Sequence, residues 1–98
     1  MGWTIILENE EHKEIVKLSH DFQSGFLHPE EKLEHFRLLK YLDPYCDTTF
    51  NKIQMDDLIA DLKKLKKEDI NNAQIDEILK MAERCKAEAH TYLAFYGD

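Results

Sequence analysis

Apolar residues recur at three- and four-residue spacing along most of this chain, which is the pattern of amphipathic helices. Residues 8–23 predict a first helix, with Ile15, Leu18 and Phe22 on its inner face and acids near its start. The same spacing predicts three more helices, which cover residues 29–42, residues 54–67 and the stretch from Asn71 or Asn72 to Tyr96. The predicted fold is therefore mainly α, a small bundle of about four helices preceded by a short extended segment.

The N-terminal residues also support a second interpretation. Residues 3–7 place their larger side chains at alternate positions, as a strand does, and the β-branched Ile15 and Val16 suit a strand as well. The alternative is an α+β fold in which residues 3–7 and 15–18 pair as an N-terminal β-hairpin. The helix over residues 8–23 is the preferred interpretation.

Length and charge narrow the possible functions. A chain of 98 residues is the size of one domain, so residues 1–98 are expected to form a single helical domain. Its formal net charge is −7, and the first 50 residues hold ten acids against five bases. Nucleic acids and anionic membranes select for excess Lys and Arg, so neither is an expected partner.

No segment has the pattern of a targeting signal or a membrane span. A spanning helix needs roughly 20 apolar residues, whereas the apolar run near the start is only residues 5–7. The cytoplasm is therefore the predicted compartment. Cys46 and Cys85 are expected to be reduced there, with Cys85 serving as a small core residue because it falls on an apolar stripe.

Motifs for catalysis or cofactor binding are not found in the sequence. The five histidines lack the paired spacing of a zinc site, and Glu31 and His35, four residues apart, suit a solvated pair better than a metal site. Three glycines are too few for a phosphate-binding loop, and nothing beside Cys46 favours a reactive thiolate. The prediction is a protein without enzymatic activity, metal or cofactor.

Acidic and aromatic residues between the second and third predicted helices suggest a protein-binding surface. Aromatic anchors supply contact area, and carboxylates speed the encounter with a basic partner. The predicted contact residues are Asp43, Tyr45, Asp47, Asp56, Asp57 and Asp61. Neutralising the last three together is expected to slow association without unfolding the protein. In the alternative interpretation, Tyr45 and Phe50 pack inward and join two helices.

Two stretches of the sequence resemble a known family. Residues 43–51 read D-P-Y-C-D-T-T-F-N and residues 90–98 read H-T-Y-L-A-F-Y-G-D. Together they resemble small acidic immunity proteins of bacterial contact-dependent growth inhibition and related polymorphic toxin systems. Cys46 departs from the family pattern, which usually has Gly at that position.

The resemblance implies a binding function. The expected partner is the C-terminal nuclease domain of a cognate toxin, with an RNase as the favoured class, held in a 1:1 complex. Carboxylates of this chain would cover the basic cleft of the nuclease and exclude its substrate. The alternative is a helical adaptor or regulatory protein-binding module unrelated to toxins.

Overall fold

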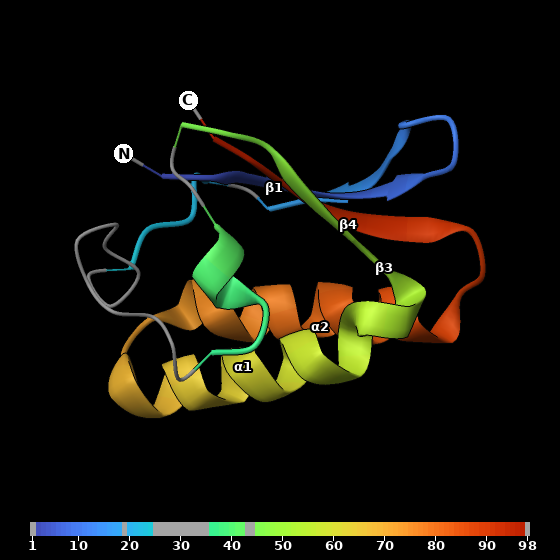
Figure 1. The fold of residues 1–98 in the computed structure, drawn as a ribbon. Helices are drawn as coiled ribbons and strands as arrows, with labels where there is room; N and C mark the ends of the chain where they lie inside the picture. The colour runs from blue at the N-terminus through green and yellow to red at the C-terminus, as the bar shows by residue number, and fades with distance from the viewer. Residues whose placement is uncertain (1, 19, 25–35, 43–44, 98) are drawn as a thin grey trace.

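The computed structural model describes residues 2–18, 20–24, 36–42 and 45–97. It is an α+β fold in which two antiparallel helices pack against one face of a four-stranded antiparallel sheet (Figure 1). Spatial order in the sheet is β2-β1-β4-β3. The elements are β1 (Thr4–Asn9), β2 (Glu14–Lys17), a 3-10 turn (Leu39–Tyr41), β3 (Thr48–Asn51), a 3-10 turn (Lys52–Gln54), α1 (Met55–Glu68), α2 (Ala73–Ala87) and β4 (Thr91–Tyr96).

The predicted four-helix bundle is wrong, because the described residues form two α-helices and a four-stranded antiparallel sheet. Helix α1 occupies the third predicted helix, and α2 occupies the first part of the fourth. Residues 8–23 contain the end of β1 and strand β2 instead of a helix, so the hairpin alternative is the correct one. Most of the second predicted helix lies outside the described residues, and in its described part, residues 36–42, only the turn Leu39–Tyr41 is helical.

The last residues of the fourth predicted helix form strand β4 instead, because their apolar side chains pack on the inner face of the sheet. In β4, Leu93 and Phe95 alternate with Tyr92 and Tyr96, so one face is apolar and the other carries tyrosines. Ile5 and Leu7 of β1 are fully buried on the same inner face. A helix would have carried Leu93 and Phe95 to different sides, whereas period-two alternation buries both against α1 and α2.

The two helices bury the faces that their sequences predicted. The buried apolar residues are Met55, Leu58, Leu62 and Leu65 of α1 and Ile75, Ile78, Met81, Ala82 and Cys85 of α2. Asn72 caps α2 by accepting a hydrogen bond from the Gln74 amide at 3.1 Å. Burial also raises the pKa of the Cys85 thiol, which confirms Cys85 as a core residue. Within the described part of the chain, neither helix is long and apolar enough to cross a membrane.

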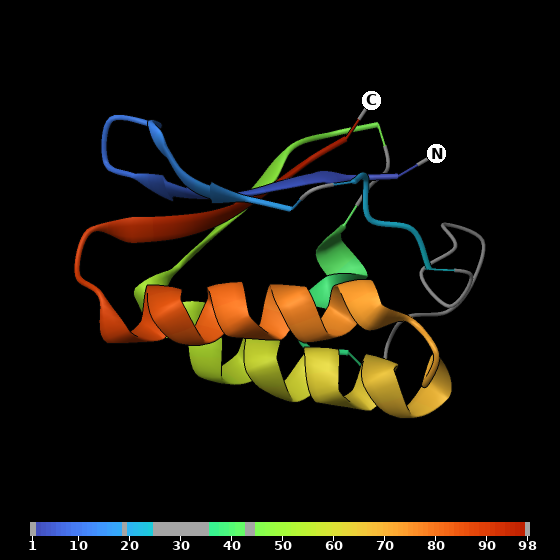
Figure 2. The ribbon, with the colours of Figure 1, turned by 180° about the vertical axis from the view of Figure 1, so that it is seen from behind.

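The opposite face of the sheet is not covered by any described element, as Figures 1 and 2 show from two sides. Side chains on this outer face belong to the alternate positions of β1 and β4, among them Ile6, Glu8, Tyr92 and Tyr96. The sheet is therefore polar and aromatic on one side and apolar on the other.

A buried carboxylate on α1 anchors the chain segment that precedes β3. Asp61 is fully buried, and its oxygens accept hydrogen bonds from three consecutive backbone amides. The donors are Arg37 at 3.0 Å, Leu38 at 2.6 Å and Leu39 at 3.0 Å. Asp61 thus satisfies the amides at the start of the turn Leu39–Tyr41, which has no side-chain cap of its own.

Replacing Asp61 by Ala should destabilise the protein strongly, because three amides would lose their acceptor. We expect the free energy of unfolding to fall by about 3 kcal/mol in a urea titration. Asp56→Ala is the matched control, since Asp56 is exposed on the same helix and pairs with Lys86 at 2.6 Å. Its effect should stay below about 1 kcal/mol. Equal losses in the two variants would contradict this role of Asp61.

Candidate functional site

Three chain connections meet at one end of the sheet, on the right in Figure 1, and we call this region the hairpin end. It comprises the β1–β2 turn (residues 10–13), the turn Lys52–Gln54 after β3, and residues 88–90 between α2 and β4. Strand pairing brings them together, because Asn9 pairs with Thr91 and Asn51 pairs with Tyr92. The hairpin end is therefore built around the start of β4.

The β1–β2 turn is held by a compact set of hydrogen bonds around Asn9. The Asn9 side-chain oxygen accepts from the Glu11 amide at 2.9 Å and from the Lys13 amide at 3.0 Å, and the Asn9 carbonyl accepts from the His12 amide. His12 has a φ of 63°, in the left-handed region that few residues other than Gly adopt. These contacts fix a turn that carries the carboxylates of Glu10 and Glu11 into solvent.

Just inside the turn, the outer face holds a buried carboxylate. Glu8 is 3% exposed, accepts a hydrogen bond of 2.5 Å from the Tyr96 hydroxyl and lies 3.4 Å from His12 Nδ1. The hydrogen bond to Glu8, together with partial burial, raises the pKa of Tyr96 to about 12. Glu8 and Tyr96 therefore form a satisfied pair that ties the first strand to the last.

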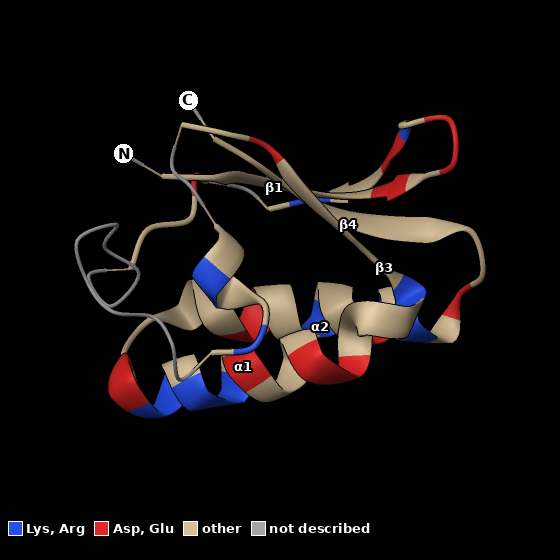
Figure 3. Ribbon diagram, viewed as in Figure 1, with Lys and Arg blue, Asp and Glu red and all other residues tan. Residues whose placement is uncertain are grey.

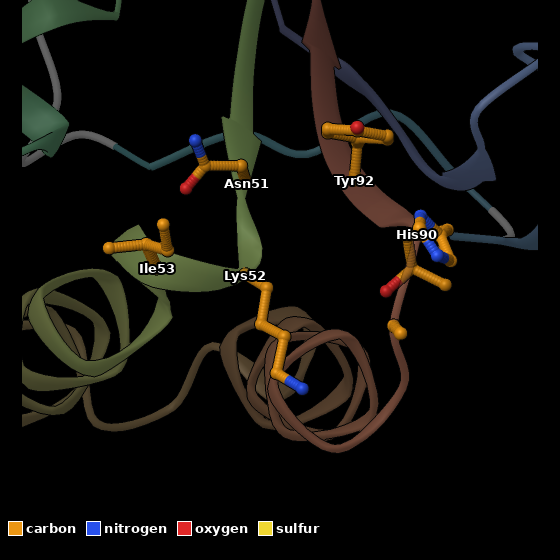
Figure 4. A pocket seen from close by; sticks show the side chains of 7 residues that line it. Asn51, Lys52, Ile53, His90 and Tyr92 are labelled. Carbon is orange, nitrogen blue, oxygen red and sulfur yellow. The ribbon is translucent and has the colours of Figure 1, made fainter.

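Two hollows open on either side of His90. One, of about 290 Å³, is lined by Asn9, Glu10, Glu11 and His90. The other, of about 320 Å³, is lined by Asn51, Lys52, Ile53, Ala89, His90, Thr91 and Tyr92 (Figure 4). His90 directly precedes β4 and has a φ of 60°, so it stands where the ladders of β4 with β1 and with β3 both end. Beyond those last pairs the chains diverge, and the hollows occupy the gaps.

The polar side chains of the hollows are held in place by their neighbours. His90 Nδ1 contacts the Glu10 carboxylate across the first hollow. Asn51 and Gln54 form a reciprocal capping box, in which the Gln54 amide donates to Asn51 at 3.1 Å and the Asn51 amide donates to Gln54 at 2.9 Å. Ile53 sits inside this box and is nevertheless 90% exposed.

The β1–β2 hairpin carries most of the acidic residues of the hairpin end. Residues 8–14 contain four glutamates and one lysine, and the red segment of the turn in Figure 3 shows their arrangement. Glu10, Glu11 and Glu14 are exposed, whereas Glu8 is buried. Glu11 pairs with Lys13 at 3.4 Å and Glu10 contacts His90, while the hairpin keeps a surplus of acids that it can present to a basic surface.

The contact residues predicted from sequence do not form one surface. Asp43 lies outside the described residues. Tyr45 and Asp47 are exposed before β3, where Asp47 accepts a hydrogen bond from the Gly97 amide at 3.2 Å. Asp56 and Asp57 lie beyond the other end of β3, on the first turn of α1. Asp61 is buried and unavailable to a partner.

The two acids on the first turn of α1 are both engaged in ion pairs. Asp57 pairs with Arg37 at 2.7 Å, and Asp56 pairs with Lys86 at 2.6 Å. The hydrogen bond from Lys86 to Asp56 raises the pKa of the Lys86 ammonium. These pairs reduce the net negative charge that this turn offers to a basic partner.

The two motifs that carry the family resemblance are neighbours in space. Residues 48–51 of the first form β3 and residues 91–96 of the second form β4, and these strands pair with each other. Phe50 is buried edge-on against Phe95 with ring centroids 5.6 Å apart, whereas Tyr45 is exposed. Phe50 is thus buried as the alternative interpretation expected, but it packs within the sheet and does not join two helices, and Tyr45 does not pack inward.

Sequence reasoning missed the hairpin acids and the hollows beside His90. Glu10 and Glu11 were assigned to the start of a helix, where acids are ordinary, and this assignment concealed their exposure on a turn. The available signal was Asn9 between two strand-like stretches, a residue that commonly begins a turn. Comparison of the chain with protein-family models, with curated proteins and with solved structures finds no match.

The Glu8–Tyr96 pair gives a testable alkaline titration. The pKa of Tyr96 lies above that of tyrosine in an unfolded chain, so its stabilisation is complete below about pH 10 and is lost as the pH rises toward 12. Tyrosinate absorbance should show a step near pH 12 that disappears in Tyr96→Phe. The exposed Tyr41 supplies the control, because Tyr41→Phe should keep the step. An absorbance step near pH 12 that persists in Tyr96→Phe would contradict the hydrogen bond between Tyr96 and Glu8.

Proposed function

We propose that this protein is a cytoplasmic immunity protein that binds the nuclease domain of a cognate toxin 1:1 and blocks it without catalysis. Support comes from the resemblance carried by residues 43–51 and 90–98 and from the acidic β1–β2 hairpin. The hairpin is the observation that carries the proposal, because it presents three exposed carboxylates, two on a turn fixed by hydrogen bonds and one at the start of β2.

The proposed mechanism is electrostatic and steric. A nuclease attracts the phosphates of its substrate with a basic cleft, and exposed carboxylates can occupy the same positive field. Glu10, Glu11 and Glu14 would enter that cleft while the sheet behind them prevents access of the polynucleotide. In this mechanism the contact acids move from the sequence-predicted Asp56 and Asp57 to the hairpin.

Fixed geometry should make such binding efficient. The Asn9 hydrogen bonds hold the turn, and the Glu8–Tyr96 pair attaches its base to β4. Ordering a flexible side chain on binding costs roughly 0.5–1.5 kcal/mol, and a loop that is already ordered avoids part of that cost. The hairpin is thus suited to tight recognition.

The decisive experiment is co-purification with the C-terminal domain of the protein that the neighbouring gene encodes, followed by a nuclease assay. We expect a stable 1:1 complex in which nuclease activity is lost. A domain that remains free, or a complex that still degrades its substrate, would refute the proposed function.

The role of the hairpin predicts a selective effect on association. Glu10→Gln combined with Glu11→Gln should slow association with the toxin domain by about tenfold at low salt, and the difference should shrink as salt rises. The double variant Glu77→Gln/Glu83→Gln is the control, because it removes the same charge from exposed positions of α2. Stopped-flow fluorescence would measure both rates. If both double variants slow association equally, the association rate depends on net charge alone, and the hairpin has no special role in binding.

A further inference from the structure

We propose that the two hollows beside His90 form one docking groove for a partner segment that carries a basic side chain next to an apolar side chain. The inference deepens the proposed function, on which it depends for the identity of the partner. We call this groove, defined by the residues that line the two hollows, the His90 groove. Its chemistry follows from the residues themselves.

The hollow nearer the hairpin suits a basic side chain. Its lining contains the carboxylates of Glu10 and Glu11 and the amide of Asn9. Glu10 contacts His90 and Glu11 pairs with Lys13 at 3.4 Å, and both pairs are exposed. An Arg side chain, which can bind a carboxylate through two parallel hydrogen bonds, would replace these weaker partners. The acidic character of the surrounding hairpin favours the same occupant.

The second hollow suits an apolar side chain. Ile53, Tyr92 and Ala89 are among the residues that line it, and Figure 4 shows Ile53 and Tyr92 on opposite sides of the Asn51–Lys52 backbone. Ile53 is the most exposed of the large hydrophobic residues in the described chain, and the Asn51–Gln54 capping box holds the turn that presents it. Covering Ile53 would remove apolar surface from water at little cost in ordering.

The positions of the charged residues fix which side chain enters which hollow. Lys52 lines only the second hollow, and in Figure 4 its side chain runs away from Tyr92 and His90 toward α2. The residues that line the second hollow include this cation and no acid, whereas the first hollow is lined by two carboxylates in exposed ion pairs, Glu10 with His90 and Glu11 with Lys13. His90 lines both hollows, so the two occupants are neighbours. A bound segment must therefore place its basic side chain in the hollow nearer the hairpin and its apolar side chain in the second hollow.

A peptide titration tests the groove without the toxin. Acetyl-Leu-Arg-Leu-Arg-amide, which alternates apolar and basic side chains, is added to isotope-labelled protein and followed by NMR. We expect saturable shifts confined to the amides of residues 9–11, 51–53 and 89–92, and their loss in Ile53→Asp. Shifts spread over other acidic surfaces, or none at all, would overturn the groove.

Binding to the toxin domain supplies the second measurement. Ile53→Asp should weaken the complex by at least about tenfold, because a hydrophobic anchor is replaced by an unpaired charge. The matched control is Ile70→Asp, which makes the same change at another exposed isoleucine, in the α1–α2 connection. Its affinity should remain within about twofold of the unaltered protein.

The two measurements separate the groove from the proposed function. Equal binding of the toxin by Ile53→Asp and Ile70→Asp would overturn the groove and leave the immunity function standing. If the peptide shifts the amide signals of the groove but the protein does not bind the toxin domain, the groove is supported and the immunity function is refuted. Circular dichroism of each variant confirms that the fold is retained.

Discussion

The pairing of β1 with β4 is the interaction on which the rest of this structure depends. Six residue pairs join the strands, from Thr4 opposite Tyr96 to Asn9 opposite Thr91. Their inner side chains form the layer on which both helices pack, and their outer side chains include the Glu8–Tyr96 pair. The same ladder sets the hairpin end, because the β1–β2 turn begins where it stops. Site and core thus share one set of backbone hydrogen bonds.

The sequence predicted those parts of the fold that local periodicity determines. The stripes of α1 and α2, the Asn72 cap and the burial of Cys85 all follow from spacing along one helix. Strands β1 and β4 depend on each other across more than 80 residues, and their side chains satisfy short helical and strand patterns equally well. Leu93 continues the stripe of α2 and so predicts a helix over residues 91–96, although Leu93 and Phe95 also alternate as in a strand. Tertiary pairing decides between the two periods.

Candidate site residues were harder to predict than the fold, for a related reason. Acids are informative only when their exposure and neighbours are known. The spacing of Asp61 on α1 resembles that of its surface neighbours, yet Asp61 is buried and accepts hydrogen bonds from three backbone amides. Glu10 and Glu11 resemble ordinary acids at the start of a helix and are exposed on a turn. The His90 groove has no linear signature, because its walls come from three connections that only the sheet brings together.

The central position of β4 also has a consequence for how the chain acquires its structure. Both of its neighbours precede it in the sequence, so β1 and β3 have no common partner until residues 91–96 leave the ribosome. Until then β1 and β2 can form only an isolated hairpin, which is marginally stable in water. Pairing of β4 with its two neighbours therefore joins residues more than 40 positions apart in the sequence, and such non-local pairing is associated with slow folding.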